Sequence, residues 1–351
     1  MVKQMPLRWE ARHRSEAPDP LYVTVPPPEF IHKSRVDQVL DDAHQQALDS
    51  AVMSIISTPI AEETFAQIVD GLPLRSVALG TQNRRVIRGD PIDNHPDMCP
   101  GALEKAREFQ MRLNTRGLEV ASAALQQYQN TPIGSKASKM PFLELVAVTI
   151  HNIAVELFKL VNGGFHKDVI WPSDEAYQER NWSRWPTPFC LLHYSKPEQY
   201  PDGIADLAGY WAEDRIFGGV VLFGRGTNDT GSTYDGIWFH SHRDDVTKRI
   251  YALTEQQTAN LLQFLEKGQI NGSVCPLPIL ADITNRRRVD EEIAIPEFNV
   301  YRDRWERTVD YRNWNDYRSQ RHHCRNAIDW PEILDYQEKL RLEVNSGSDR
   351  N

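Results

Sequence analysis

Hydrophobic residues recur at helical spacing through much of the first half of the chain. From residue 36 to residue 56 the apolar positions follow the period of an amphipathic helix, and the pattern stops before Pro59. Residues 101–129 have a composition typical of helices, and residues 142–160 are apolar on nearly all sides, as in a helix buried at the centre of a domain. The short apolar run at residues 76–80 predicts a buried strand.

The second half alternates strand-length apolar segments with turns. An apolar run at residues 189–194, a turn at residues 201–203 and a helical segment after it predict strand, turn and helix. Further along, Thr254 and Gln257 have the spacing of a capping box at the start of another helix. The remaining predicted elements are strands at residues 218–223, 237–242 and 249–253 and helices at residues 254–266 and 331–344.

Together these elements predict an α/β fold. We expect a single mixed domain, helix-rich in its N-terminal half, with the buried central helix packed on a mixed sheet, and a Rossmann-like arrangement is one form of it. A chain of 351 residues can bury a core without disulfides or metal. Residues 1–30 are polar and proline-rich and are expected to form a flexible arm, and residues 31–345 are expected to form one catalytic domain.

Composition and charge narrow the function. The chain is 40% hydrophobic and 25% charged, with a formal net charge of −9, which is typical of a soluble protein and unfavourable for a surface that binds DNA. We find no bilayer-spanning apolar run and no signal-peptide pattern, so we expect a cytoplasmic protein without membrane contact. The four cysteines lie far apart, which favours reduced thiols over a zinc ribbon or a disulfide framework. Without a P-loop or a G-x-G-x-x-G motif, no cofactor is expected.

The best candidate for chemistry lies on the helix that follows Gly203. Asp206, Tyr210 and Glu213 stand at positions i, i+4 and i+7, so two carboxylates and a phenol share one face, and Asp202 lies just before the helix. Such a stripe is more often a solvated face. Because an apolar strand follows directly, the carboxylates are also candidates for partly desolvated groups that deprotonate an amine or bind a guanidinium.

Arginines and aromatic rings alternate from residue 301 to residue 325. Seven arginines and four acids give this segment a local excess of positive charge. The mixture suits single-stranded or hairpin RNA, whose phosphates need cations and whose bases stack on rings, and it suits an internal network of ion pairs equally well. The residues expected to contact substrate or RNA here are Arg302, Arg304, Trp305, Arg307 and Arg312.

His240 and His242 are spaced H-x-H on a predicted strand, so both side chains point to the same side. Some metal sites present two ligands in this way, and His193 or an aspartate at residues 244–245 is available as a third. Histidines hydrogen-bonded at the end of a strand are the more frequent reason for this spacing, and no metal is assigned to it.

Three other side chains are less specific candidates. Ser195 and Cys190 are potential nucleophiles, but neither lies in a G-x-S-x-G elbow. His151 lies in the apolar helix, where a histidine is more often a satisfied core residue than a ligand.

Several longer stretches carry a family resemblance. The runs QYPDGIADLAGYWAEDRIFGGVVLFGRG, GIWFHSHR, CPLPILADITNRRR, VYRDRWER and IDWPE resemble a widespread family of filamentous-fungal proteins, over residues 110–335. The family is similar to the arginine-containing cyclodipeptide synthases of secondary-metabolite gene clusters. We associate an acidic D-D-x-x-E motif with it, and this chain has the shorter D-x-x-E, as Asp303 with Glu306 or Asp329 with Glu332. Asp303 and Glu306 therefore count among the catalytic candidates.

The resemblance implies a reaction and its partners. Arginyl-tRNA and a second aminoacyl-tRNA would be condensed into a diketopiperazine. Asp206 and Glu213 would deprotonate the amine and bind the arginine side chain, Tyr210 would orient the amine or protonate the leaving ribose oxygen, and residues 301–325 would bind tRNA. Two other classes stay open: a metal-dependent oxygenase or hydrolase that uses His240 and His242, and a non-catalytic partner in a biosynthetic pathway.

Overall fold

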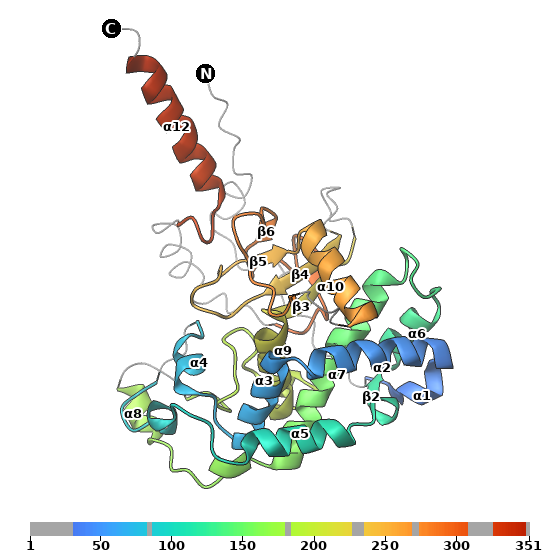
Figure 1. Cartoon of the computed structure of the whole chain (residues 1–351). Coiled ribbons are helices and arrows are strands. Elements are labelled where there is room, and N and C mark those ends of the chain that lie inside the picture. The colour runs from blue at the N-terminus through green and yellow to red at the C-terminus, as the bar shows by residue number, and fades with distance from the viewer. Residues whose placement is uncertain are drawn as a thin grey trace.

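The chain is described by a computed structural model that covers residues 31–82, 86–179, 184–226, 235–268, 274–307 and 326–348. Helices of the first half surround one long helix, and an antiparallel sheet adjoins them (Figure 1). This combination of helices and a sheet is the mixed fold that the sequence predicts. The expected N-terminal arm at residues 1–30 and Arg312 lie outside the described residues.

Three helices open the described chain: α1 (Val36–Val39), α2 (Asp42–Ile56) and α3 (Pro59–Asp70). The sequence predicts one helix over residues 36–56, but the chain turns at Asp41, whose carboxylate accepts a hydrogen bond from the N–H of His44 and starts α2. Thr58 caps α3, and Gly71, in the left-handed region at φ 95°, ends it.

The segment at residues 76–80 belongs to a helix, α4 (Arg75–Leu79). The strand predicted there is wrong, because a short apolar run fits a partly buried helical turn as well as a strand. Residues 101–129 hold α5 (Ala102–Arg112), the strand β2 (Glu119–Ala121), which pairs with β1 (Lys33–Arg35), and α6 (Ser122–Gln129). Short 3-10 helices lie at Pro91–Asn94 (η2), Thr115–Gly117 (η3), Gly164–His166 (η4) and Pro197–Gln199 (η5).

The central helix is α7 (Lys139–Val161), as the apolar run predicts. The sequence analysis predicts no run able to span a bilayer, but α7 is long and apolar enough to do so by length and composition. Its most apolar part is 72% buried, as in the core helix of a soluble protein. α9 (Ile204–Phe217) packs along α7. A Cβ on Gly209 of α9 would lie 2.6 Å from the ring of His151, so glycine permits this close approach.

The sheet has five strands in the order β6-β5-β4-β3-β7. Their bounds are Val220–Gly224 (β3), Gly236–His240 (β4), Ile250–Ala252 (β5), Arg288–Val289 (β6) and Val300–Tyr301 (β7). Every described pairing is antiparallel, so the sheet is not mixed and the Rossmann-like arrangement does not hold. For β3, β4 and β5 the linkers at residues 225–235 and 241–249 are the reason, because they are shorter than a parallel crossover requires.

Residues 189–194 form a buried turn in place of the predicted strand, with an isolated bridge between Leu191 and Tyr194. The apolar run there reflects burial and not extended backbone. A further short helix, α8, spans Asp174–Gln178. The capping box of Thr254 and Gln257 starts α10 (Glu255–Lys267), as predicted, and the C-terminal helix α12 (Glu332–Ser348) extends away from the rest of the fold (Figure 1).

Candidate functional site

The acidic stripe of α9 faces the interior. Asp206 is 6% exposed, Tyr210 2% and Glu213 0%, so the alternative of a solvated face is wrong for these residues. Carboxylates buried this deeply need partners, because an unpaired buried charge is costly. The partners come from α7 and from the segment that follows β7.

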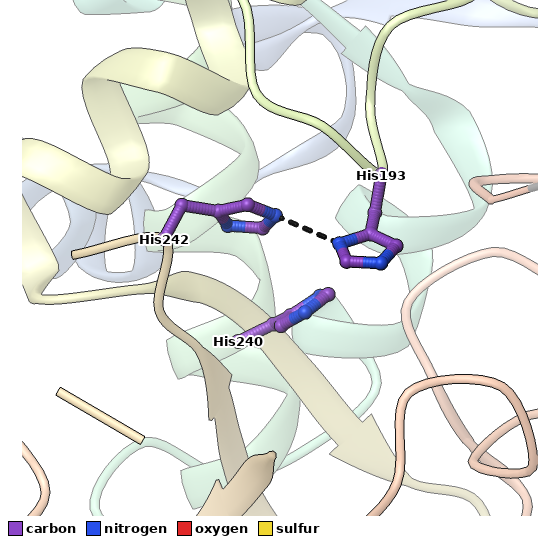
Figure 2. Close-up of side chains that lie close together, drawn as sticks. All are labelled: His193, His240 and His242. Carbon is purple, nitrogen blue, oxygen red and sulfur yellow. Dashed lines mark hydrogen bonds between the residues drawn. The ribbon is translucent and has the colours of Figure 1, made fainter. Parts of the chain in front are cut away.

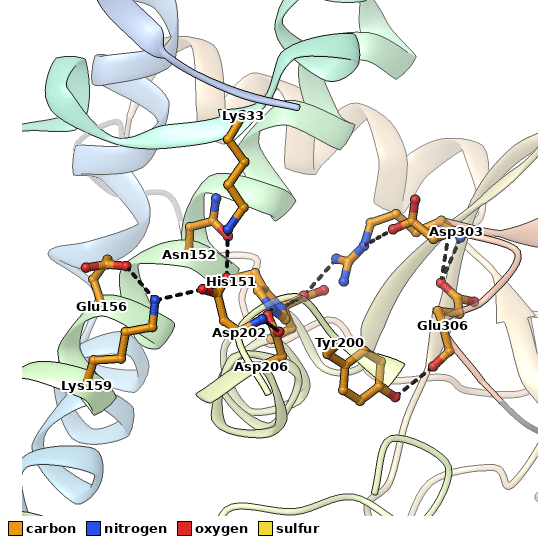
Figure 3. A network of polar contacts seen from close by, with 12 residues as sticks. Lys33, His151, Asn152, Glu156, Lys159, Tyr200, Asp202, Asp206, Asp303 and Glu306 are labelled. Atoms are coloured by element: carbon orange, nitrogen blue, oxygen red, sulfur yellow. Dashed lines mark hydrogen bonds and ion pairs between the residues drawn. The ribbon is translucent and has the colours of Figure 1, made fainter. Parts of the chain in front are cut away.

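His151 of α7 lies between the two carboxylates of α9. Its Nε2 is 3.0 Å from Oδ1 of Asp206 (Figure 3). Its Nδ1 is 2.7 Å from Oε1 of Glu213. Burial alone would lower the pKa of His151, but hydrogen bonds to Asp206 and Glu213 outweigh burial and raise it. Burial would raise the pKa of Glu213, but Arg302 and His151 outweigh burial and lower it. Both shifts favour an imidazolium ion held between carboxylates.

Arg302, directly after β7, completes the pairing of Glu213. Its Nη1 donates to Oε1 of Glu213 at 2.7 Å, and the two side chains are 5% and 0% exposed. The N–H of Val221 in β3 donates to the other carboxylate oxygen at 3.2 Å. The guanidinium carbon of Arg302 also lies 5.0 Å from the ring centroid of Tyr210. Glu213 therefore connects α7, α9, β3 and the segment after β7.

Glu306 closes the D-x-x-E unit into a turn. Its Oε2 accepts the N–H groups of Arg302 at 2.9 Å and Asp303 at 3.2 Å, and its Oε1 lies 3.3 Å from Nε of Arg307. Burial raises the pKa of Glu306 in spite of the two arginines. The hydroxyl of Tyr200 donates to the backbone carbonyl of Glu306 at 2.8 Å (Figure 3). Glu306 is fully buried, and its hydrogen bonds to the N–H groups of Arg302 and Asp303 hold the turn that carries Asp303.

An acidic pocket of about 180 Å³ lies beside this network. This volume suits one amino-acid side chain and is below the roughly 300–1,000 Å³ of drug-sized sites. Carboxylates outnumber cations in its lining. The charged and aromatic lining residues are Glu144, Asp202, Asp206, Asp303, Lys33, His151, Arg302, Tyr200, Tyr210 and Trp305.

Asp303 is the most open of the pocket carboxylates. Its Oδ2 lies 3.9 Å from Nε of Arg302, and 43% of its side chain is exposed. Asp202, by contrast, is 2.7 Å from Nζ of Lys33 and 2.8 Å from Nζ of Lys159 (Figure 3). The pocket wall desolvates Asp303 and raises its pKa, while the exposed part of the carboxylate limits that effect. Asp303 is therefore the group best placed to meet a ligand.

Of the described arginines in the basic segment, two are buried and one is exposed. Arg302 and Arg307 are 7% and 2% exposed and lie beside Glu213 and Glu306, so the internal-network alternative holds for these two. Arg304 is exposed, and Trp305 lines the acidic pocket. The arginines from residue 308 to residue 325 lie outside the described part of the chain.

His193, His240 and His242 form a second candidate site (Figure 2). Nδ1 of His193 lies 3.2 Å from Nε2 of His242, and one candidate ligand atom from each ring lies within 4.8 Å of the others. Nε2 of His193 is also 3.5 Å from a carboxylate oxygen of Glu291. The fold thus supplies His193 as the third histidine, while residues 244–245 are exposed. Three converging imidazoles are the donor set of many metal centres.

Comparison with known proteins does not decide between the two sites. No family model, curated protein or solved structure matches the chain. The sequence resemblance and the geometry of the two sites therefore carry the functional argument.

Helical spacing predicted the acidic face of α9 but not the part that His151 plays in it. We expected a satisfied core histidine, and the groups that satisfy it are the carboxylates proposed for catalysis. The signal was Gly209, a glycine inside the acidic stripe of a helix, where a close neighbour is the usual reason for the residue. The nucleophile candidates Ser195 and Cys190 do not line the acidic pocket.

Proposed function

We propose that the chain is a tRNA-dependent cyclodipeptide synthase of the cytoplasm, which condenses an arginyl group with a second aminoacyl group into a diketopiperazine. The sequence resemblance supports this reaction class. The observation that carries the proposal is the acidic pocket, whose lining combines an excess of carboxylates with the rings of Tyr210 and Trp305. A guanidinium suits such a pocket because carboxylates bind it through paired hydrogen bonds and aromatic faces stack on it.

The reaction consists of two aminolysis steps on activated esters. The amine of one aminoacyl group attacks the ester carbon of the other, a C–N bond forms, and the C–O bond to the ribose breaks. The attacking ammonium loses a proton, and the ribose oxygen leaves with one. A second aminolysis closes the ring and releases the other tRNA. Because the ammonium has a pKa of about 8, a carboxylate beside it is a suitable proton acceptor only where burial raises its basicity.

The pocket residues divide these tasks by their exposure. Asp303, open and with a raised pKa, accepts the proton of the attacking ammonium. Burial raises the pKa of Tyr210 well above its usual value, so its phenol stays protonated and donates to the leaving ribose oxygen. Asp206 adds negative charge to the pocket wall. Glu213 and Glu306 do not line the pocket and act as positioning residues.

The proposal is tested by expression of the full chain in a bacterium and by mass spectrometry of the medium for arginine-containing diketopiperazines. We expect product from the wild type and a loss of roughly 100-fold or more in Asp303→Asn, the size of a general-base contribution. The matched control is Asp335→Asn, which removes an exposed ion pair between Asp335 of α12 and Arg286. This variant should retain product. Soluble wild-type protein that releases no such product would overturn the proposal.

A metal-dependent enzyme is the second candidate, and the convergence of His193, His240 and His242 favours it. A catalytic metal needs three protein ligands and an open position, which three histidines provide. Metal analysis of the wild type and of His240→Ala tests this candidate. Loss of bound metal in the variant supports it, and equal metal content in the two proteins contradicts it.

A further inference from the structure

A group of metal-ligating side chains lies apart from both candidate sites, where α3 ends. Asp70 is the last residue of α3, His95 directly follows η2, Cys99 lies four residues beyond it, and His166 ends η4. Asp70 is 0% exposed and His95 is 5% exposed. Imidazole nitrogen, thiolate sulfur and carboxylate oxygen are the ligand atoms that zinc takes in proteins.

The ligand atoms are spaced as they would be around one small ion. Nε2 of His95 lies 3.2 Å from Oδ2 of Asp70, and Nε2 of His166 lies 3.2 Å from Oδ1 of Asp70. Sγ of Cys99 lies 3.2 Å from the same nitrogen of His166. Zinc bonds of about 2.0–2.3 Å at tetrahedral angles separate neighbouring ligand atoms by roughly 3.3–3.7 Å. The four side chains therefore need little movement to share an ion.

Hydrogen bonds account for only part of this arrangement. Oδ1 of Asp70 and Nε2 of His95 are buried, and neither has a hydrogen-bond partner among the described residues, although each lies 3.2 Å from an atom of the cluster. Buried polar atoms are almost always satisfied, and a fully buried carboxylate needs a counter-charge. A divalent cation at the centre of the cluster meets both needs.

Close backbone packing brings the three segments together. A Cβ on Gly164 would lie 2.3 Å from the carbonyl oxygen of Val69, so only glycine lets the chain after α7 rest on the end of α3. This close contact places His166 beside Asp70. The N–H of Cys99 donates to Oδ2 of Asp70 at 2.9 Å, which fixes the third segment.

We infer that Asp70, His95, Cys99 and His166 bind a structural zinc ion. Four protein ligands fill a tetrahedral coordination shell and leave no position for substrate, as in structural sites. The ion joins the end of α3 to the loop after η2 and to the segment after α7. Only the H-x-x-x-C spacing of His95 and Cys99 is local in the sequence, so a search for paired cysteines passes over the site.

Metal analysis and cobalt replacement of the full-length protein test this inference. We expect about one tightly bound zinc ion per chain that is lost in Cys99→Ser and in His95→Ala, and that is retained in Cys275→Ser, the matched cysteine control. The variant His240→Ala should retain it as well, which separates this site from the three-histidine cluster. Cobalt in place of zinc should give the strong visible absorption of a tetrahedral ion and a thiolate-to-metal band in the near ultraviolet.

The cobalt spectrum keeps the inference falsifiable where a variant fails to fold. If folded, metal-loaded wild-type protein lacks the thiolate band, Cys99 is not a ligand and the inference is wrong. Zinc retained in Cys99→Ser but lost in His240→Ala would also overturn it, because the ion would then belong to the three-histidine cluster. The inference is also wrong if the wild-type protein binds neither zinc nor cobalt.

Discussion

Glu213 and Arg302 form a buried ion pair with 2.7 Å between Oε1 and Nη1, although the two residues are 89 positions apart in the chain. Two charges are stable at this depth only when each has further partners. Glu213 has the imidazole of His151 and the N–H of Val221, and Arg302 has the ring of Tyr210. The pair therefore fixes the position of the pocket wall relative to the sheet.

Replacement of Arg302 by methionine tests this coupling. In Arg302→Met, Glu213 loses its strongest cation while it stays buried, so we expect the free energy of unfolding to fall by about 3–5 kcal/mol. Urea denaturation measures the change. Arg304→Met is the matched control, since Arg304 is exposed, and should change stability by less than about 0.5 kcal/mol. Equal effects of the two substitutions would contradict a structural role for the pair.

The same network predicts how stability depends on pH. The pKa of His151 is raised from 6.5, so its contribution is complete below pH 6.5 and is lost as the pH rises through the raised value. The pKa of Glu213 is lowered from 4.5, so its contribution is complete above pH 4.5 and is lost as the pH falls through the lowered value. The network should therefore stabilise the fold most between pH 4.5 and pH 6.5.

The alkaline side of this window is measured with His151→Asn. Above pH 6.5 the free energy of unfolding of the wild type should fall more steeply with pH than that of the variant. The difference between the two slopes should approach about 1.4 kcal/mol per pH unit, the value for one proton that only the folded state binds. Denaturation at a series of pH values gives both curves. Parallel curves would show that His151 does not carry the extra proton in the folded state.

Local chemistry in the sequence was sufficient for the elements with their own start and stop signals. Thr254 and Gln257 predicted the start of α10, and the apolar run predicted at residues 218–223, which follows a helical segment, holds most of β3. Apolar runs without such signals were ambiguous, because burial selects hydrophobic residues in any conformation. For that reason residues 76–80 proved helical and residues 189–194 proved to be a turn.

The sites could be predicted only where their residues are neighbours in the chain. Asp206 and Glu213 share one helix, so their common face followed from helical spacing. Their partners His151 and Arg302 come from distant segments, and no local pattern connects them. The zinc ligands are harder still to find, since Asp70, Cys99 and His166 meet only through tertiary packing.

The close contact of α9 with α7 predicts that alanine is harmful at Gly209. Alanine normally stabilises a helix by about 1 kcal/mol relative to glycine. Here the added Cβ would lie 2.6 Å from the ring of His151, so we expect Gly209→Ala to cost about 1–3 kcal/mol by overpacking. The His151→Ala background removes the ring and is the control, in which the cost should disappear. A Gly209→Ala variant as stable as wild type would mean that the helices separate easily.

The acidic pocket predicts a preference for cationic ligands that is measurable without tRNA. Calorimetry with arginine methyl ester should detect binding to wild type, and Asp303→Asn should weaken it by roughly 10- to 100-fold, the range for loss of a hydrogen bond to a charged group. Asp335→Asn should bind like wild type. The uncharged citrulline methyl ester should bind more weakly than the arginine ester. Equal affinities for the two esters would show that the pocket does not recognise the guanidinium group.

The zinc site predicts that chelation destabilises the helical half of the protein. Removal of the ion leaves the carboxylate of Asp70 buried without a cation and frees the loop that holds Cys99, so the melting temperature should fall. A strong chelator added before thermal unfolding measures the effect, and restored zinc should reverse it. Cys99→Ser should melt at a lower temperature than wild type and respond little to the chelator, because the ion is already lost. If the chelator lowered the melting temperature of both proteins equally, the stabilising ion would not be bound by Cys99.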